Sequence, residues 1–171
     1  MIRKKVISAT IAVLTMSSLI VSGQEATAAE KSFGPKGFDL QAHRGGMGLT
    51  VESSIASFSH ALELGVSTLE LDVQITEDDK AVVTHDRKIS NAVCKDTAPA
   101  FENDPEYPYV GKYIKDLTLE QIRTMDCGSL SKLQYSGQVT SPGAKMLLLT
   151  DVFDLVKQYD EKKVLMNIET K

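Results

Sequence analysis

The sequence predicts an α/β fold built on a parallel sheet, and two patterns lead to this prediction. A strand pattern at 38–43, a helical pattern and a second strand pattern at 68–75 follow in the order of a βαβ crossover, which makes both strands parallel. A helical pattern and a strand pattern then recur over 150–159 and 164–169. The length of 171 residues and the hydrophobic content of 42% are typical of a globular protein.

The first crossover begins with the strand FDLQAH and the glycine-rich turn RGGMG at 44–48. Apolar residues then recur at helical spacing, at Ile55, Phe58, Ala61 and Leu62. Ser53 or Ser54 is expected to cap the start of this helix, and Gly65 to end it. The second strand, TLELDVQI, follows directly.

The next strand pattern, at 81–84, has a different connection. Asp78 and Asp79 leave room only for a tight turn, so this strand is expected to fold back antiparallel as a hairpin. The hairpin opens an insertion at about 76–145, whose Gly-, Pro- and Tyr-rich stretches predict irregular structure. Inside it, Thr118 and Gln121 form a capping-box pattern that predicts a short helix from Leu119 to near residue 128.

The insertion also contains both cysteines of the chain, Cys94 and Cys127. An even count in an oxidising compartment favours a disulfide, worth roughly 3 to 4 kcal/mol for a loop of this length. Two free thiols are the alternative. A structural zinc site is not expected, because two cysteines without a histidine cluster do not complete one.

The N-terminal residues have the layout of a secretory signal peptide. Three basic residues precede an apolar run at 6–21, and Ala26-Thr27-Ala28 supplies the small residues of a cleavage site. Residues 1–28 are therefore expected to be removed, leaving a secreted, extracellular or periplasmic protein at 29–171 without a stable membrane span. An uncleaved anchor is disfavoured because polar residues interrupt a run that is already short.

The charge pattern gives no indication of a nucleic-acid partner. The net charge is −4, and the basic residues are scattered among acids rather than arranged in a stripe with aromatics. Loss of residues 1–28 removes three basic residues and one acid, which makes the mature chain still more acidic. An acidic protein that acts on an anionic substrate needs a cation, and the sequence sets no oligomeric state.

Carboxylates are placed where such a cation could bind. Glu70 and Asp72 alternate along a buried strand and therefore project from the same face. Glu169 ends the last strand, and Lys171 follows it. Because the C-terminal ends of parallel strands meet at one edge, these groups are expected to converge on a divalent cation. A solvated polar face is the alternative reading of the alternation.

Two histidines accompany these carboxylates. His43 ends the first strand beside Arg44, and His85 follows the hairpin. Histidine can accept or supply a proton near neutral pH, and arginine can hold a phosphate through two hydrogen bonds. His60, inside the first helix, is expected to be structural.

Together these motifs resemble the glycerophosphodiester phosphodiesterases, particularly the secreted bacterial ones. The resemblance is carried by His43-Arg44-Gly45, Glu52, Glu70-x-Asp72, His85-Asp86 and Ile168-Glu169-Thr170-Lys171. It implies a (β/α)8 TIM barrel of the phosphodiesterase type, incomplete in this chain because only the N-terminal part of the domain is covered, with a small insertion after strand 2. Val51-Glu52-Ser53 stands where the family usually has Pro-Glu-Asn.

The resemblance also implies roles for these residues. Ca²⁺ or Mg²⁺ would be held by Glu70, Asp72 and Glu169, with His43 and His85 as the acid/base pair. Arg44, Lys171 and Glu52 would contact a small phosphodiester substrate, which would be hydrolysed to glycerol 3-phosphate and an alcohol. Two alternatives stay open: a related phosphodiesterase acting on teichoic acid or lipid head groups, and a secreted binding protein without turnover.

Overall fold

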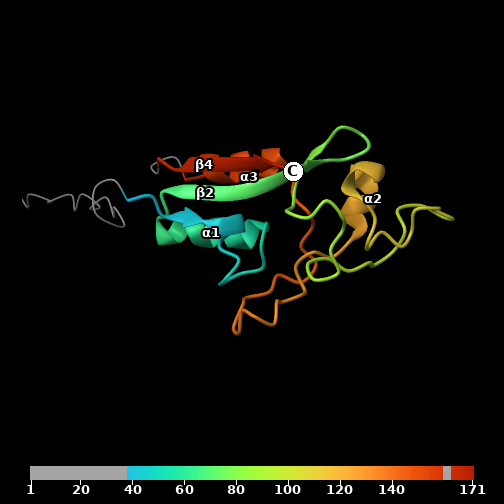
Figure 1. The fold of residues 1–171 in the computed structure, drawn as a ribbon, viewed down its shortest axis with the longest axis horizontal. Helices are drawn as coiled ribbons and strands as arrows, with labels where there is room; N and C mark the ends of the chain where they lie inside the picture. Colours follow the sequence, from blue (N-terminus) through green and yellow to red (C-terminus); the bar gives the residue numbers. More distant parts are fainter. Residues whose placement is uncertain (1–37, 160–162) are drawn as a thin grey trace, which may run out of the picture. The chain divides into compact units, whose positions relative to one another are not determined.

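A computed structural model describes residues 38–159 and 163–171, so the segment expected to be a signal peptide lies outside the described residues. The secondary structure follows the order expected from the sequence (Figure 1). In chain order the elements are β1 (Gln41–Ala42), the 3₁₀ turn η1 (His43–Gly45), α1 (Ile55–Leu64), β2 (Thr68–Ile75), β3 (Ala81–Val83), the 3₁₀ turn η2 (Ile114–Asp116), α2 (Leu119–Thr124), α3 (Leu149–Lys157) and β4 (Leu165–Thr170).

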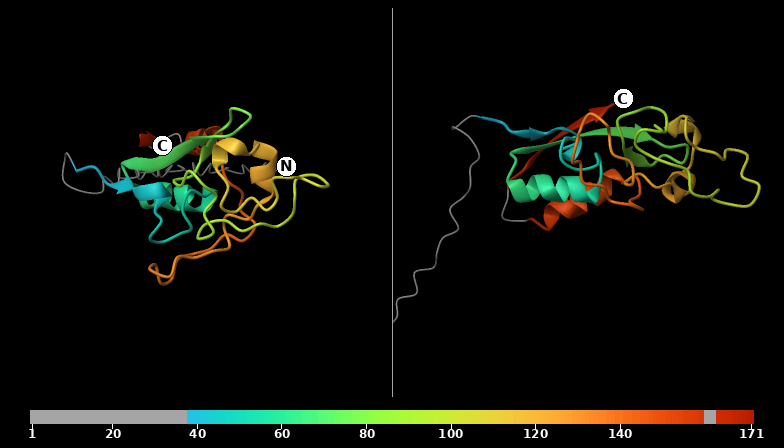
Figure 2. Two further views of the ribbon diagram at one scale, coloured as in Figure 1. Left: turned by 45° about the vertical axis from the view of Figure 1, so that its right-hand side comes forward. Right: turned by 90° about the horizontal axis from the view of Figure 1, so that it is seen from below.

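Strand β2 is the centre of the sheet. It pairs in parallel with β1 and β4 and antiparallel with β3, which confirms both the crossovers and the hairpin. Helices α1 and α3 lie side by side on one face of this sheet (Figure 2, right). Parallel strands covered on one face by their crossover helices are the arrangement expected of part of a (β/α)8 barrel, so the described residues agree with the predicted incomplete TIM barrel.

The alternation along β2 separates the core from the opposite face. Leu69, Leu71 and Val73 are buried in the main hydrophobic cluster with residues of α1 and α3. Glu70 and Asp72 therefore point to the other face of the sheet, yet they too are buried. The interpretation of this strand as one with a solvated polar face is therefore wrong.

Local capping sets the ends of α1. Ser54 is the N-cap, and its side chain accepts a hydrogen bond from the Ser57 backbone N–H, while Gly65 ends the helix at φ 80°. At the other end of the turn that precedes α1, Gly45 has φ 78°, and a Cβ there would lie 2.6 Å from the Ser57 hydroxyl. Only glycine allows this turn to approach the helix so closely.

The insertion has its own hydrophobic cluster, which includes the Cys94–Cys127 disulfide predicted from the sequence. It extends beyond the C-terminal end of β2 (Figure 1). Helix α2 has the predicted capping box at Thr118 and Gln121 but ends at Thr124, earlier than expected. It ends there because the buried Met125 is extended and the next residue pairs with another segment of the insertion.

The start of α3 also differs slightly from the expectation at Thr150-Asp151. The helix begins at Leu149, because Asp151 accepts a hydrogen bond from the Leu148 backbone N–H at 2.8 Å and thus lies in the first turn instead of capping it. Within 38–159 and 163–171, none of the helices combines the length and the apolar character needed to cross a bilayer.

Candidate functional site

Three carboxylates meet where the first half of β2 lies beside the C-terminal end of β4. The parallel register places Asp72 directly opposite Glu169, and Glu70 lies one side-chain repeat earlier on the same face of β2. One oxygen from each of the three groups lies within 4.8 Å of the others. The structure therefore brings together the three residues predicted to hold a cation.

Asp72 is the most buried of these groups, with 1% of its side chain exposed. Its Oδ1 lies 3.0 Å from Lys171 Nζ and its Oδ2 lies 3.8 Å from Arg44 Nε. Despite these charges, neither oxygen accepts a well-directed hydrogen bond within the described residues. A buried carboxylate that faces charges without well-directed hydrogen bonds, in a set of oxygen donors only, fits a hard divalent cation such as Ca²⁺ or Mg²⁺.

Lys171 joins the carboxylates from the β4 side. Its Nζ lies 2.6 Å from Glu169 Oε2. The hydrogen bond from Lys171 holds the pKa of Glu169 below its ordinary value, and the contacts with Glu169 and Asp72 raise the pKa of Lys171. Glu169 is therefore ionised, and Lys171 is charged, over the whole neutral range.

Arg44 reaches the same cluster through its backbone and its side chain. Its φ of 51° is unusual for a residue with a Cβ, and this conformation directs its N–H to Glu70 Oε2 at 2.6 Å. Its guanidinium donates to Glu52 Oε1 at 3.0 Å. Arg44 thus orients one cluster carboxylate with its backbone while its charged end lies beside another, Asp72.

Glu52 lies behind Arg44 rather than among the three carboxylates. Only 5% of its side chain is exposed, and both oxygens are engaged, one by Arg44 and the other by Lys132 of the insertion. Direct substrate contact by Glu52 stays a prediction, but in this arrangement its two oxygens serve to hold cations.

The two histidines reach the cluster from different segments. His85 Nδ1 lies 2.8 Å from Asp86 Oδ1, and this hydrogen bond lowers the pKa of Asp86. An ionised Asp86 accepts a hydrogen bond from the Nδ1–H group of His85. The other ring nitrogen, Nε2, is then the one available for proton transfer. His43 follows β1 and is exposed, and positive charge on either histidine further lowers the pKa of Glu169.

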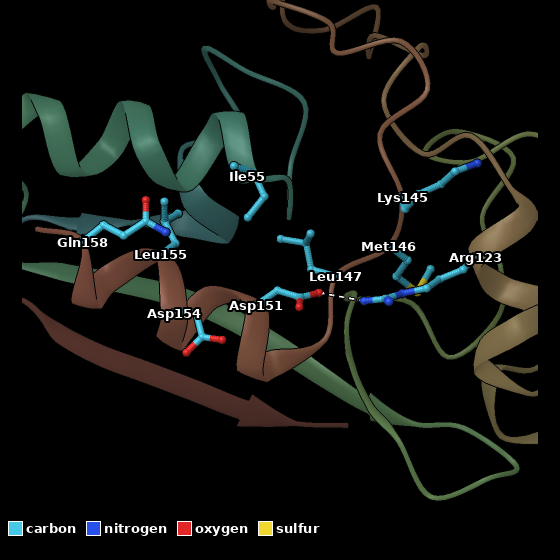
Figure 3. Close-up of a pocket in the computed structure, with 9 residues that line it drawn as sticks. All are labelled: Ile55, Arg123, Lys145, Met146, Leu147, Asp151, Asp154, Leu155 and Gln158. Carbon is cyan, nitrogen blue, oxygen red and sulfur yellow. Dashed lines mark hydrogen bonds and ion pairs between the residues drawn. The ribbon is translucent and has the colours of Figure 1, made fainter.

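A cavity of about 420 Å³ lies away from these residues, between α1, α3 and α2 (Figure 3). It is lined by Ile55, Arg123, Lys145, Met146, Leu147, Asp151, Asp154, Leu155 and Gln158. Arg123 Nη2 lies 2.9 Å from Asp151 Oδ2 across it. None of the predicted site residues lines this cavity. His60 lies on α1 with an exposed side chain and is not part of the cluster.

Sequence reasoning assigned no role to two residues that contact the site. Asp86 was visible as the acid that follows His85, and this adjacency could have indicated its hydrogen bond. Lys132 carries no such indication, since it is one lysine in an irregular stretch, 80 residues from the Glu52 that it contacts.

Comparisons with known proteins agree with the arrangement. The model of the glycerophosphoryl diester phosphodiesterase family matches residues 43–171. A glycerophosphodiester phosphodiesterase of Caldanaerobacter subterraneus subsp. tengcongensis is 32% identical over 130 residues, which are 76% of this chain and 44% of that protein. One from Bacillus altitudinis is 33% identical with the same coverage. The chain thus spans less than half the length of these relatives.

Solved structures show the same fold. A candidate glycerophosphoryl diester phosphodiesterase from Silicibacter pomeroyi matches with a TM-score of 0.66 at 26% identity, covering 78% of this chain and 45% of that one. An Oleispira antarctica phosphodiesterase in complex with the product sn-glycerol-3-phosphate matches with a TM-score of 0.57 at 22% identity, covering 78% and 44%. At that identity the second likeness concerns the fold alone.

Proposed function

The chain belongs to the glycerophosphoryl diester phosphodiesterase family, and from this we propose that the whole protein hydrolyses glycerophosphodiesters to glycerol 3-phosphate and an alcohol. The observation that carries the proposal is the meeting of Glu70, Asp72 and Glu169, with one oxygen of each within 4.8 Å of the others.

In this proposal the three carboxylates hold Ca²⁺ or Mg²⁺. When bound, such a cation neutralises charge on the phosphoryl group and favours the deprotonated form of an oxygen nucleophile, either water or the glycerol hydroxyl of the substrate. Lys171 and Arg44 lie beside Asp72 on two sides, so both cations are placed to contact the remaining phosphoryl oxygens. The substrate phosphate thus replaces contacts that these cations now make with carboxylates.

His43 and His85 divide the proton transfers. One accepts the proton of the nucleophile and the other donates a proton to the leaving alcohol. Asp86 supports His85 by fixing its Nδ1 proton, which leaves Nε2 as the atom that exchanges a proton with the substrate. The two imidazoles come from different loops, so they can approach the phosphate from different directions.

The direct test is release of glycerol 3-phosphate from glycerophosphocholine by the full-length protein. We expect EDTA to abolish activity and Ca²⁺ or Mg²⁺ to restore it. His43→Ala and His85→Ala should each lower kcat by about 10²- to 10⁴-fold, the range of general acid–base catalysis. His60→Ala is the matched control and should retain activity. Activity that survives both EDTA and His43→Ala would contradict the mechanism, and ligand binding without turnover would favour a binding protein.

We also propose that the protein is exported. The proposal is supported by the signal-like layout of residues 1–28 and by the disulfide at Cys94–Cys127, since disulfides persist in oxidising compartments. Cell fractionation followed by mass spectrometry tests it, with a mature N-terminus near residue 29 as the expected result. An intact N-terminus in the cytoplasmic fraction would contradict it.

A further inference from the structure

Glu52 is a buried carboxylate shared by two cations. Its side chain is 5% exposed, and its oxygens are engaged by Arg44 Nη1 at 3.0 Å and by Lys132 Nζ. The two cationic side chains are themselves only 13% and 20% exposed. Charges buried to this extent interact strongly, because little water screens them. Glu52 therefore connects Lys132 to Arg44 by direct contacts with both.

Lys132 is held in place by the loop that contains it, residues 132–139. Two backbone hydrogen bonds of Val139, at 2.8 and 3.0 Å, join this loop to the turn that ends at Val51. The side chain of Gln138 donates to two carbonyl groups of that turn at 2.6 and 3.2 Å and accepts from the Lys132 backbone N–H at 2.9 Å. The insertion thus delivers one lysine to Glu52 by a defined set of contacts.

The charge balance gives this contact a consequence. Arg44 and Glu52 alone form a pair without net charge, whereas Lys132 gives the group of three a net charge of +1. Arg44 also lies between two acids. Its Nε is buried 3.8 Å from Asp72 and has no hydrogen-bond partner in the described part of the chain. A second cation on Glu52 weakens the hold of that acid on Arg44 and leaves the guanidinium available to an anion.

We propose that Lys132 is a positioning residue that sets the orientation and the available charge of Arg44 through Glu52. The inference rests on the proposed function in one respect, since the anion that Arg44 would bind is the phosphate of the substrate. It extends that function by making the insertion part of the phosphate site, although Lys132 itself does not contact the substrate.

The test begins with Lys132→Met in the full-length protein, which removes the charge and keeps most of the side-chain length. We expect KM for glycerophosphocholine to rise about tenfold with kcat nearly unchanged, because the lost interaction acts on phosphate binding. Lys132→Arg should restore KM. Lys115→Met is the matched control, since Lys115 is an exposed lysine of the insertion that forms an ion pair with the neighbouring Asp116.

A measurement without turnover separates this inference from the proposed function. The Arg44 Nε–Hε resonance in a ¹⁵N NMR spectrum, assigned by its loss in Arg44→Lys, should move in Lys132→Met and stay in place in Lys115→Met. If the wild type hydrolyses no glycerophosphodiester, the proposed function fails. The position of the Arg44 resonance in Lys132→Met still tests whether Lys132 positions Arg44, because this measurement needs no turnover. An unmoved resonance in Lys132→Met would overturn the inference.

A double variant distinguishes positioning from direct contact. In a Glu52→Gln background, Lys132→Met should cause no further loss of affinity for sn-glycerol 3-phosphate, because the group that connects the two cations is gone. An equal loss in both backgrounds would mean that Lys132 binds the phosphate itself, and this too would overturn the inference.

Discussion

Two residues near the carboxylate cluster have unusual backbone conformations. Arg44 and Ser53 both have positive φ, at 51° and 54°, although each carries a Cβ. In Arg44 this conformation has a visible use, since it directs the backbone N–H to Glu70. The Ser53 backbone N–H donates to the Arg44 carbonyl at 3.0 Å, but the Ser53 hydroxyl is buried without a hydrogen-bond partner among the described residues. Asparagine, usual in the family at this position, tolerates such a conformation better than serine.

Ser53→Gly should therefore stabilise the protein. Glycine relieves the backbone strain of the folded state, although it also gives the unfolded chain more conformational freedom. The relief of strain is the larger effect, so we expect the free energy of unfolding to rise by about 0.5 to 1 kcal/mol. The neighbouring Ser54→Ala should lower it by about 1 kcal/mol, because Ser54 caps α1. Urea denaturation measures both, and a loss of stability in Ser53→Gly would refute the strain argument.

At the scale of elements, the insertion is stabilised by buried polar contacts as well as by its disulfide. Asp104 is 7% exposed and accepts hydrogen bonds from the Tyr109 hydroxyl at 2.6 Å and from Gln121 at 3.0 Å. Burial opposes ionisation of Asp104, but these hydrogen bonds outweigh it and hold its pKa below the ordinary value of 3.8. Burial, together with the nearby Asp104, raises the pKa of Tyr109 from 10.0 to about 12.

These shifts set the pH range in which the network is stabilising. The Asp104 contribution is complete above about pH 3.8 and is lost as the pH falls through its lower folded-state pKa. The Tyr109 contribution is complete below pH 10 and is lost as the pH rises towards 12. We expect the difference in melting temperature between wild type and Asp104→Asn to shrink below pH 3.8. The exposed Asp154→Asn should show no such change, and a constant difference for Asp104→Asn would contradict the assignment.

The elements also show what could be predicted from sequence. Periodicity and capping predicted α1, β2, the hairpin and α2, because each depends on contacts between residues close in the chain. The end of α2 was misplaced by a few residues because burial of Met125, a tertiary effect, decides it. The start of α3 was misplaced because Asp151 accepts a hydrogen bond from the Leu148 backbone N–H three residues earlier, a local contact that the pattern of apolar residues does not show. The contact between Lys132 and Glu52 depends on a loop docking across the structure, which local patterns do not encode.

At the scale of the whole molecule, the carboxylate cluster links folding to cation binding. Glu70, Asp72 and Glu169 repel one another, so a cation that binds them only in the folded state stabilises that state. At a free concentration of about 100 times the dissociation constant, Ca²⁺ or Mg²⁺ should raise the free energy of unfolding by about 2.7 kcal/mol. Asp72→Asn should abolish this gain, whereas Glu63→Gln on the exposed face of α1 should keep it. Thermal denaturation with and without the cation measures this stabilisation. If the cation stabilises Asp72→Asn as much as the wild type, the cluster is not the binding site.

The parallel pairing of β2 with β4 has a further consequence during synthesis. Glu70 and Asp72 leave the ribosome long before Glu169, which completes the cluster, and Lys171, which directly follows β4. Until β4 pairs, β2 carries two closely spaced negative charges on a face that the finished sheet buries. Acquisition of a tightly held divalent ion by the nascent chain would therefore mark the moment at which this long-range pairing forms.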